Sequence, residues 1–276
     1  VYRKQLGAKI AFLSAVFFMS VLYFTSMLGV NRQQVAELFF ALFILLMIER
    51  SLHLSQKAVL VSIFVVSIVV SHYALGIMCL GIFIVAWVVM LFYRHHPSRA
   101  FSQRILVGIG IIYFAFAIGW YGFISSGQAI ETTSRIADEQ TAMILGEGRS
   151  ETLGEVSREP LVETALGLDF PEASPTGKMF RIFQYITEIF IIVGYVGLVF
   201  GAGRRRFKPE FVALRIGVSL FLLACVFLPY FSGHFESERF YQITLLLLSP
   251  LCVAGGAIIW QVLTYNPKHY LSFIAL

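Results

Sequence analysis

The sequence predicts an all-α, polytopic integral membrane protein with about eight transmembrane helices. Of its 276 residues, 58% are hydrophobic and only 13% are charged, and the mean hydropathy is +0.80. Soluble domains carry about 25% charged residues, so lipid must cover much of this chain. The formal net charge of +5 is explained by basic residues collecting in cytoplasmic loops. Membrane lipid is therefore an expected partner, and nucleic acid is not.

A helix needs about 20 apolar residues to cross the hydrocarbon core, because each residue adds about 1.5 Å to its length. Eight apolar runs meet or approach that length, the second and third being short. The runs are Ala8–Val30, Val35–Ile48, Ala58–Ser71, Ala74–Tyr93, Ile105–Ile124, Phe183–Ala202, Phe211–Phe231 and Tyr241–Trp260.

The third and fourth runs meet in a long uncharged stretch. From Ala58 to Tyr93 the chain has no Lys, Arg, Asp or Glu, which is too long for one spanning helix and short for two. We therefore expect a helix break near Ser71-His72, at or below the outer membrane surface. Alternatively, the third helix begins near Leu54 and the Lys57 side chain extends to the membrane surface.

The distribution of charge predicts the orientation. With a cytoplasmic N-terminus, thirteen of the 21 Lys and Arg residues fall in inside segments and seven in outside segments, which agrees with the positive-inside rule. Twelve of the 16 acidic residues fall outside. We expect a multi-pass protein of the cell membrane, with five spans in residues 1–124, an extracytoplasmic loop at 125–177 and three spans in residues 178–276. Because the chain begins Val-Tyr-Arg-Lys, without an initiator methionine or a signal-peptide pattern, we expect it to be part of a longer protein.

The loop at 125–177 has two parts. Its first half, QAIETTSRIADEQTAMIL, spaces apolar residues as in a short amphipathic helix. Its second half is rich in glycine and proline, and Ser174-Pro175 or Thr176 can cap the sixth spanning helix. The loop is either a solvated spacer or a gate for a substrate.

Polar residues gather at the predicted outer ends of the helices, where ionisable groups usually face a cavity or a partner. Arg32 and Glu37 flank the start of the second run, with Gln33 four residues from Glu37 on the same face. His72 and Tyr73 lie at the expected helix break. We expect each group to line a substrate cavity. The structural alternative for Arg32 and Glu37 is that they tie their helix to a neighbouring one. The alternative for His72 is a hydrogen-bonded packing residue.

The most regular pattern is GKMFRIFQYITEIF. Lys178, Arg181, Tyr185 and Glu188 follow one another at i, i+3, i+7 and i+10, with Gln184 beside them, which draws one polar stripe along an apolar helix. Two cations above a deeper carboxylate suit a cavity wall that accepts a phosphate at its top. The alternative is that the cations reach out to the membrane surface while Glu188 bonds a neighbouring helix.

A fourth polar group lies between the seventh and eighth runs. The stretch PYFSGHFESERFYQ contains His234, Glu236 and Arg239. Arginine binds phosphate oxygens through two parallel hydrogen bonds. His234 and Glu236 are candidate ligands for a divalent cation, but two ligands are no metal signature, so the cofactor remains unassigned. An ordinary solvated loop is the alternative.

Four glycines inside apolar runs predict close helix packing. They are Gly108, Gly110, Gly194 and Gly197.

Four segments resemble an uncharacterised family of archaeal multi-spanning membrane proteins known mostly from methanogens. They are NRQQVAELFFALFILL, IVVSHYALG, LGLDFPEASPTGKMFRIFQYITEIFIIVG and SERFYQITLLLLSPLCVAGG, and the resemblance covers most of the chain. That family is distantly similar to the GT-C glycosyltransferases, which move a sugar from a polyprenyl-phosphate carrier to an acceptor outside the cytoplasm. GT-C enzymes place an acidic catalytic motif in the first external loop. Here that loop, GVNRQQ, has no acidic residue before Glu37, so a catalytic acid would lie upstream of Val1 or be absent.

The resemblance implies a membrane-embedded glycosyltransferase-like protein whose catalytic residues and acceptor stay unassigned, and a fold matching the C-terminal part of a GT-C enzyme. Arg181, Arg239 and Lys178 would hold the lipid phosphate. The substrate cavity would be formed by Arg32, Glu37, His72, Tyr73, Tyr185, Glu188, His234 and Glu236. A transporter or lipid flippase, or a non-catalytic membrane scaffold, is the alternative.

Overall fold

The structure is a computed structural model, and it describes most of the apolar part of the chain. The described residues are 3, 7–20, 31–49, 51–92, 99–124, single positions and short runs between 127 and 171, and 173–200, 209–227 and 237–264.

The described residues form eight α-helices and no strand, which confirms the predicted all-α polytopic fold. The helices are α1 (Ala8–Ser20), α3 (Asn31–Ile48), α4 (Leu54–Ser71), α5 (Tyr73–Phe92), α6 (Arg99–Gly119), α9 (Pro175–Phe200), α10 (Pro209–Phe227) and α12 (Ser237–Leu263). They follow the eight predicted runs in order. A π-helical turn, η3 (Trp120–Ile124), ends α6.

Among the described residues, five helical segments are long and apolar enough to cross a membrane. They are Asn31–Ile48, Tyr73–Phe92, Val107–Ile124, Pro175–Gly197 and Phe240–Leu263. Two shorter apolar helical segments, Ala8–Ser20 and Ser55–Ser71, accompany them. The second half of the first predicted run lies outside the described residues.

The third helix begins earlier than the run at Ala58. It starts at Leu54, as in the alternative interpretation, but the Lys57 side chain does not extend away from the protein. Its side chain is only 5% exposed, and its ammonium group donates to the carbonyl oxygens of Met47 (3.2 Å) and Glu49 (3.1 Å). The last carbonyls of a helix have no partner within the helix, so Lys57 satisfies those at the end of α3.

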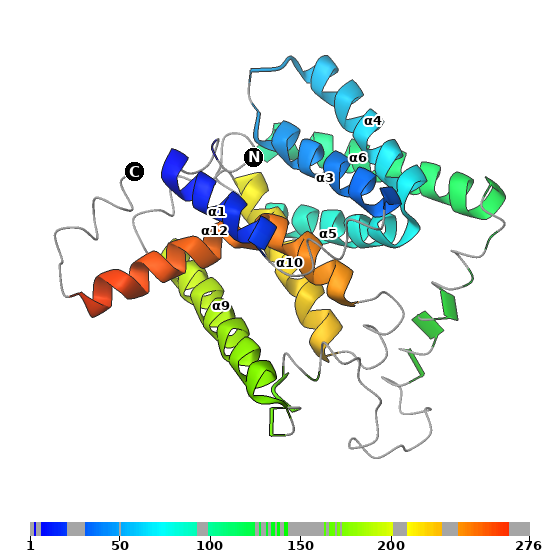
Figure 1. Cartoon of the computed structure of the whole chain (residues 1–276). Helices are drawn as coiled ribbons and strands as arrows, with labels where there is room; N and C mark the ends of the chain where they lie inside the picture. Colours follow the sequence, from blue (N-terminus) through cyan, green and yellow to red (C-terminus); the bar gives the residue numbers. More distant parts are fainter. Residues whose placement is uncertain are drawn as a thin grey trace.

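The helices fall into two groups that α10 joins. One group contains α3, α4, α5 and α6, and α10 packs on α5 and α3. The other contains α9 and α1, which pack on α12, and α12 also contacts α10. Figure 1 shows α9 and α12 crossing at one side of the molecule and α4 and α6 at the other.

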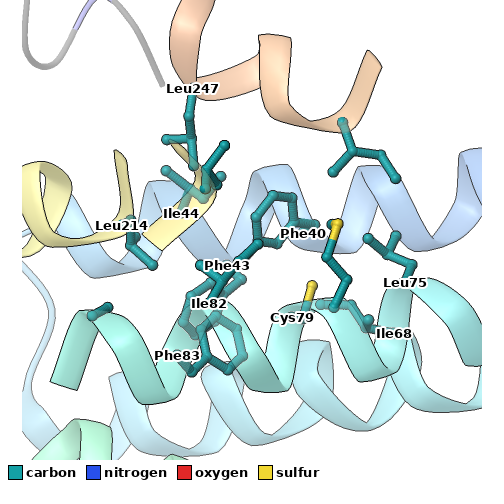
Figure 2. Packing of buried hydrophobic residues seen from close by; sticks show 14 of the residues in the cluster. Phe40, Phe43, Ile44, Ile68, Leu75, Cys79, Ile82, Phe83, Leu214 and Leu247 are labelled. Atoms are coloured by element: carbon teal, nitrogen blue, oxygen red, sulfur yellow. The ribbon is translucent and has the colours of Figure 1, made fainter. Parts of the chain in front are cut away.

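The apolar core lies where α3, α5, α10 and α12 meet. Figure 2 shows Phe40 and Phe43 of α3 pointing toward α5, with Leu247 of α12 approaching from the opposite side. The rings of Phe43 and Phe83 lie 4.5 Å apart, and Phe40, Phe43 and Leu247 are fully buried. The core thus joins the middle parts of α3, α5 and α12.

One residue, His72, separates α4 from α5. Its backbone is extended, with φ −153° and ψ 115°, so the helical hydrogen-bond pattern stops there. A broken helix leaves backbone groups that must find partners in a membrane. Tyr121, placed by the π-helical turn of α6, donates its hydroxyl to the carbonyl of Val69 (2.9 Å). Tyr113 of α6 donates to the carbonyl of Gly76 in the first turn of α5.

Glycine lets α9 and α12 touch through their backbones. A Cβ added at Gly255 would meet the carbonyl oxygen of Phe190 and come within 2.7 Å of the backbone nitrogen of Gly194. A Cβ at Gly194 would meet the carbonyl oxygen of Leu251, and one at Gly197 would meet the side chain of Ile258. The predicted packing role is confirmed for Gly194 and Gly197.

The packing role predicted for Gly108 and Gly110 is wrong. Among the described residues, an added Cβ at either position would meet no atom within 4 Å. A glycine in an apolar run permits close approach but does not show that a partner is present.

Candidate functional site

The start of α3 carries a hydrogen-bonded polar pair. Gln33 is completely buried, and its side-chain amide nitrogen donates to a carboxylate oxygen of Glu37 at 2.9 Å. Arg32, the residue before Gln33, is exposed. The sequence indicated that Gln33 and Glu37 share a face, but it gave no sign that Gln33 is the more deeply buried of the two.

The break between α4 and α5 fixes the His72 ring. The backbone N–H of Leu75 donates to Nδ1 of His72 at 3.2 Å, so the imidazole caps the start of α5. Tyr73 stacks on this ring with centroids 5.8 Å apart and planes 11° from parallel. Tyr73 is 46% exposed. The pair therefore presents an aromatic face whose position is set by the helix break.

The start of α9 combines a cap with two cations. The Ser174 hydroxyl accepts the N–H of Gly177 at 3.1 Å, and Pro175 is the first helical residue, the arrangement expected for an N-cap. The first turn of α9 has no acidic residue. Lys178 and Arg181 thus add positive charge to the positive end of the helix dipole, where an anion is favoured.

The polar stripe of α9 is half-buried, whereas the apolar residues between its members are largely exposed. Lys178, Arg181, Tyr185 and Glu188 are all of intermediate exposure. Phe183 beside them is 60% exposed, as expected for a surface covered by lipid. Within the stripe, the amide nitrogen of Gln184 donates to Glu188 at 3.3 Å, which repeats the Gln33–Glu37 pairing on a second helix.

A short segment before α9 folds onto this stripe. The Phe170 ring lies 6.5 Å from that of Tyr185, and the ammonium of Lys178 lies 5.9 Å from the Phe170 centroid. Gly167 has a positive φ of 73°, and an added Cβ would come within 2.7 Å of the Tyr185 hydroxyl oxygen. The described positions of the long loop thus include a segment that covers the upper part of the stripe.

The face of α9 that carries the stripe also carries a polar contact with α10. Tyr195 lies seven residues beyond Glu188, about two turns along the same face. Its hydroxyl donates to the carbonyl of Arg215 at 3.1 Å and also bonds the Ser219 hydroxyl. The Arg215 side chain is 1% exposed, with its guanidinium 4.2 Å from the centroid of the Phe211 ring.

Sequence reasoning gave Arg215 and Tyr195 no role. The only signal for Arg215 was a single arginine early in the seventh apolar run. Tyr195 carried none, because a tyrosine in an apolar stretch has many structural uses.

The predicted site residues lie in several separate clusters. Arg32 and Glu37 lie on α3, His72 and Tyr73 at the break between α4 and α5, and Lys178, Arg181, Tyr185 and Glu188 on α9. Figure 1 shows the start of α9 away from the junction of α4 and α5, with the end of α10 and the start of α12 between them. Arg239 lies in the first turn of α12. Its side chain, and all of His234 and Glu236, lie outside the described residues.

These helices define a multi-pass α-helical membrane protein with polar clusters on α3, at the break between α4 and α5, and along α9. The chain belongs to the family described as "Predicted membrane protein (DUF2206)", whose model matches residues 57–270. No curated protein and no solved structure matches the chain. The expectation of an uncharacterised family of multi-spanning membrane proteins is thus confirmed.

Proposed function

We propose that this membrane protein is glycosyltransferase-like and binds the phosphate of a polyprenyl-phosphate-linked sugar at the start of α9. The observation that supports the proposal is the half-buried stripe of Lys178, Arg181, Tyr185 and Glu188. Two cations on one face at the positive end of a helix repel each other and the helix dipole. A bound phosphate would relieve both repulsions. The phosphate of a lipid could enter this site from the membrane because the neighbouring residues of α9 are exposed.

In this proposal the two cations stabilise the charge that develops as the phosphate leaves the sugar. Arg181 is suited to hold two phosphate oxygens at once, and Lys178 acts as a point charge. Stabilisation of developing charge is usually the largest catalytic contribution. Arg239, at the start of α12, is a third candidate for the same phosphate. The resemblance to archaeal membrane proteins and to GT-C enzymes leads to the same substrate class, with the start of α9 on the outer face of the cell membrane.

The remaining candidate residues are assigned to the sugar and its acceptor. Arg32 and Glu37 lie on α3, and His72 with Tyr73 offers an aromatic face at the break between α4 and α5. Tyr185 and Glu188 lie below the cations on α9, and His234 and Glu236 belong to the connection before α12. Phe170, packed against Tyr185 and Lys178, is the part of the loop that would have to move for a headgroup to enter.

The test is binding of radiolabelled polyprenyl phosphate to the full chain in lipid nanodiscs. Each hydrogen bond to a charged group contributes about 1.5–3 kcal/mol, so Arg181→Ala should weaken binding at least about tenfold, and Lys178→Ala/Arg181→Ala should weaken it further. Arg135→Ala removes one charge from the long loop and serves as the control. If inorganic phosphate at equal concentration displaces the polyprenyl phosphate, the site recognises the phosphate group alone. Equal binding by the wild type and the double variant would refute the proposal.

A lipid flippase remains the second candidate because of one contact. Tyr195 extends the polar face of α9 beyond Glu188 to Ser219 and the backbone of Arg215, so polar groups are not confined to one end of the helix. Vesicles that contain the protein distinguish the two functions. A flippase exposes polyprenyl phosphate of the inner leaflet to an added phosphatase, whereas a transferase does not.

A further inference from the structure

The start of α3 carries an unsatisfied hydrogen-bond acceptor. Gln33 is completely buried and uses its amide nitrogen on Glu37 (2.9 Å). Its amide oxygen is buried and has no hydrogen-bond partner within the part of the chain that the structure describes. Buried polar atoms in native proteins almost always have a partner, so an unsatisfied one points to a group that binds there.

A second amide oxygen is in the same condition. Gln242, in the second turn of α12, is 2% exposed, and its side-chain oxygen is also buried without a partner among the described residues. Figure 1 shows α3 and α12 beginning toward the same side of the molecule. Two helices thus bring unsatisfied acceptors to the same end of the helix bundle.

The Gln33–Glu37 pair offers mainly acceptors. One of the two amide hydrogens of Gln33 is directed at Glu37, and a carboxylate only accepts hydrogen bonds. What remains is the amide oxygen and the second amide hydrogen of Gln33 and the carboxylate of Glu37. A partner that serves both acceptors must bring two donors a few ångströms apart, and a hydroxyl group can also accept the remaining amide hydrogen.

A cation is a poor match for this position. The pair lies at the start of α3, where the helix dipole is positive, and Arg32 adds a positive charge next to it. A divalent metal needs about six or more oxygen ligands. The described residues contain no group of three or more His, Cys, Asp or Glu that could hold one. Neighbouring hydroxyl groups supply two donors without adding charge.

We propose that Gln33 and Glu37 bind neighbouring hydroxyl groups of a sugar or similar polyol at the start of α3. The amide oxygen of Gln33 accepts one hydroxyl hydrogen and the carboxylate of Glu37 accepts the next. The inference rests on the proposed function, since it names the group recognised beside the lipid phosphate, and it adds Gln33 to the candidate residues. A site built to bind hydroxyl groups discriminates strongly against ligands that lack them, because its buried polar atoms are then left without partners.

The first test compares ligands on the wild-type protein in nanodiscs by saturation-transfer NMR. The probes are methyl α-glucopyranoside, which has neighbouring hydroxyls, cyclohexanol, which has one, and methylammonium chloride, which is a cation. Saturation transfer to the glucoside well above that to cyclohexanol and methylammonium supports the inference. Equal transfer to the glucoside and cyclohexanol, stronger transfer to methylammonium, or no transfer to any probe would overturn it.

The second test uses Gln33→Met, which keeps the length of the side chain and removes the acceptor. Glucoside binding should fall at least about tenfold, the effect of losing one hydrogen bond to a buried group. Gln56→Met makes the same substitution at an exposed position in the first turn of α4, which lies near the end of α3 opposite to Gln33. This variant should bind the glucoside as the wild type does. Unchanged binding by Gln33→Met, with both variants folded as judged by thermal unfolding, contradicts the inference.

Polyprenyl phosphate binding to the same samples separates this inference from the proposed function. Gln33→Met should retain it, because the phosphate is assigned to α9. If the wild type binds polyprenyl phosphate but not the glucoside, only the polyol site on α3 is contradicted. If the wild type binds the glucoside but not polyprenyl phosphate, only the assignment of the phosphate to α9 is contradicted.

Discussion

The contact between α9 and α12 permits a prediction with a matched control inside the chain. In Gly255→Ala the new Cβ would lie 2.7 Å from the backbone nitrogen of Gly194 and would meet the Phe190 carbonyl. Ordinary contact begins at 3.4 Å, so the two helices must part by at least 0.7 Å, the difference between these distances. Neither backbone atom can move aside by changing rotamer.

The magnitude follows from the lost packing. A gap of about 0.5–1 Å removes a quarter to a half of each dispersion contact, and overpacking of this kind typically costs about 1–3 kcal/mol. We expect a value of about 3 kcal/mol for Gly255→Ala, because the obstruction is backbone on both sides. The loss falls on α9, whose main packing partner is α12.

The assay is thermal unfolding in detergent, followed by circular dichroism, with Gly108→Ala as the control. Both glycines lie inside apolar helices, but an added Cβ at Gly108 meets no described atom within 4 Å. Alanine is favoured over glycine in a helix by about 1 kcal/mol, so Gly108→Ala should be as stable as the wild type or more so. At roughly 2–4 °C per kcal/mol, the two variants should melt about 10 °C apart. Melting within about 2 °C of each other would refute the close contact.

Two further predictions concern backbone groups that side chains satisfy. Tyr121→Phe removes the hydroxyl that donates to Val69 and leaves a buried carbonyl without a partner, so thermal unfolding should show a loss of about 1–3 kcal/mol; an unchanged melting temperature would contradict this role. Lys57→Met removes the ammonium that bonds the carbonyls of Met47 and Glu49. Hydrogen–deuterium exchange should then rise about tenfold in the last turn of α3, with little change in α12, whereas unaltered exchange at α3 would show that the cap does not hold this turn.

The helices could be predicted from the sequence because their cause is local. An apolar run of the right length forms a helix in lipid whatever its neighbours are, and the order of the eight runs matches the order of the eight described helices. The start of α4 also has a local cause, because the side-chain oxygen of Gln56 accepts the backbone N–H of His53 at 3.3 Å, but the burial of Lys57 does not. Lys57 is buried only because the end of α3 lies beside it, and that contact has no local signature.

The site could be predicted in part for the same reason. The stripe on α9 and the Gln33–Glu37 pair are periodic features of single helices, so their shared faces follow from spacing alone. The cap that His72 forms depends on where α4 breaks, and the bond from Tyr195 to Arg215 depends on how α9 meets α10. Contacts of this kind depend on tertiary packing, which no spacing rule supplies.

The repeated Gln–Glu pair suggests how polar groups are kept inside these helices. At Gln33–Glu37 and Gln184–Glu188 an amide nitrogen four residues earlier satisfies one carboxylate oxygen, so part of the cost of placing a carboxylate in a membrane is met within the helix itself. The two pairs then differ in environment. Gln33 is completely buried in the bundle, whereas Gln184 and Glu188 are half-buried on a helix whose neighbouring residues, such as Phe183, are exposed. The same pairing therefore suits a polar ligand enclosed by protein at α3 and a lipid headgroup entering from the membrane at α9.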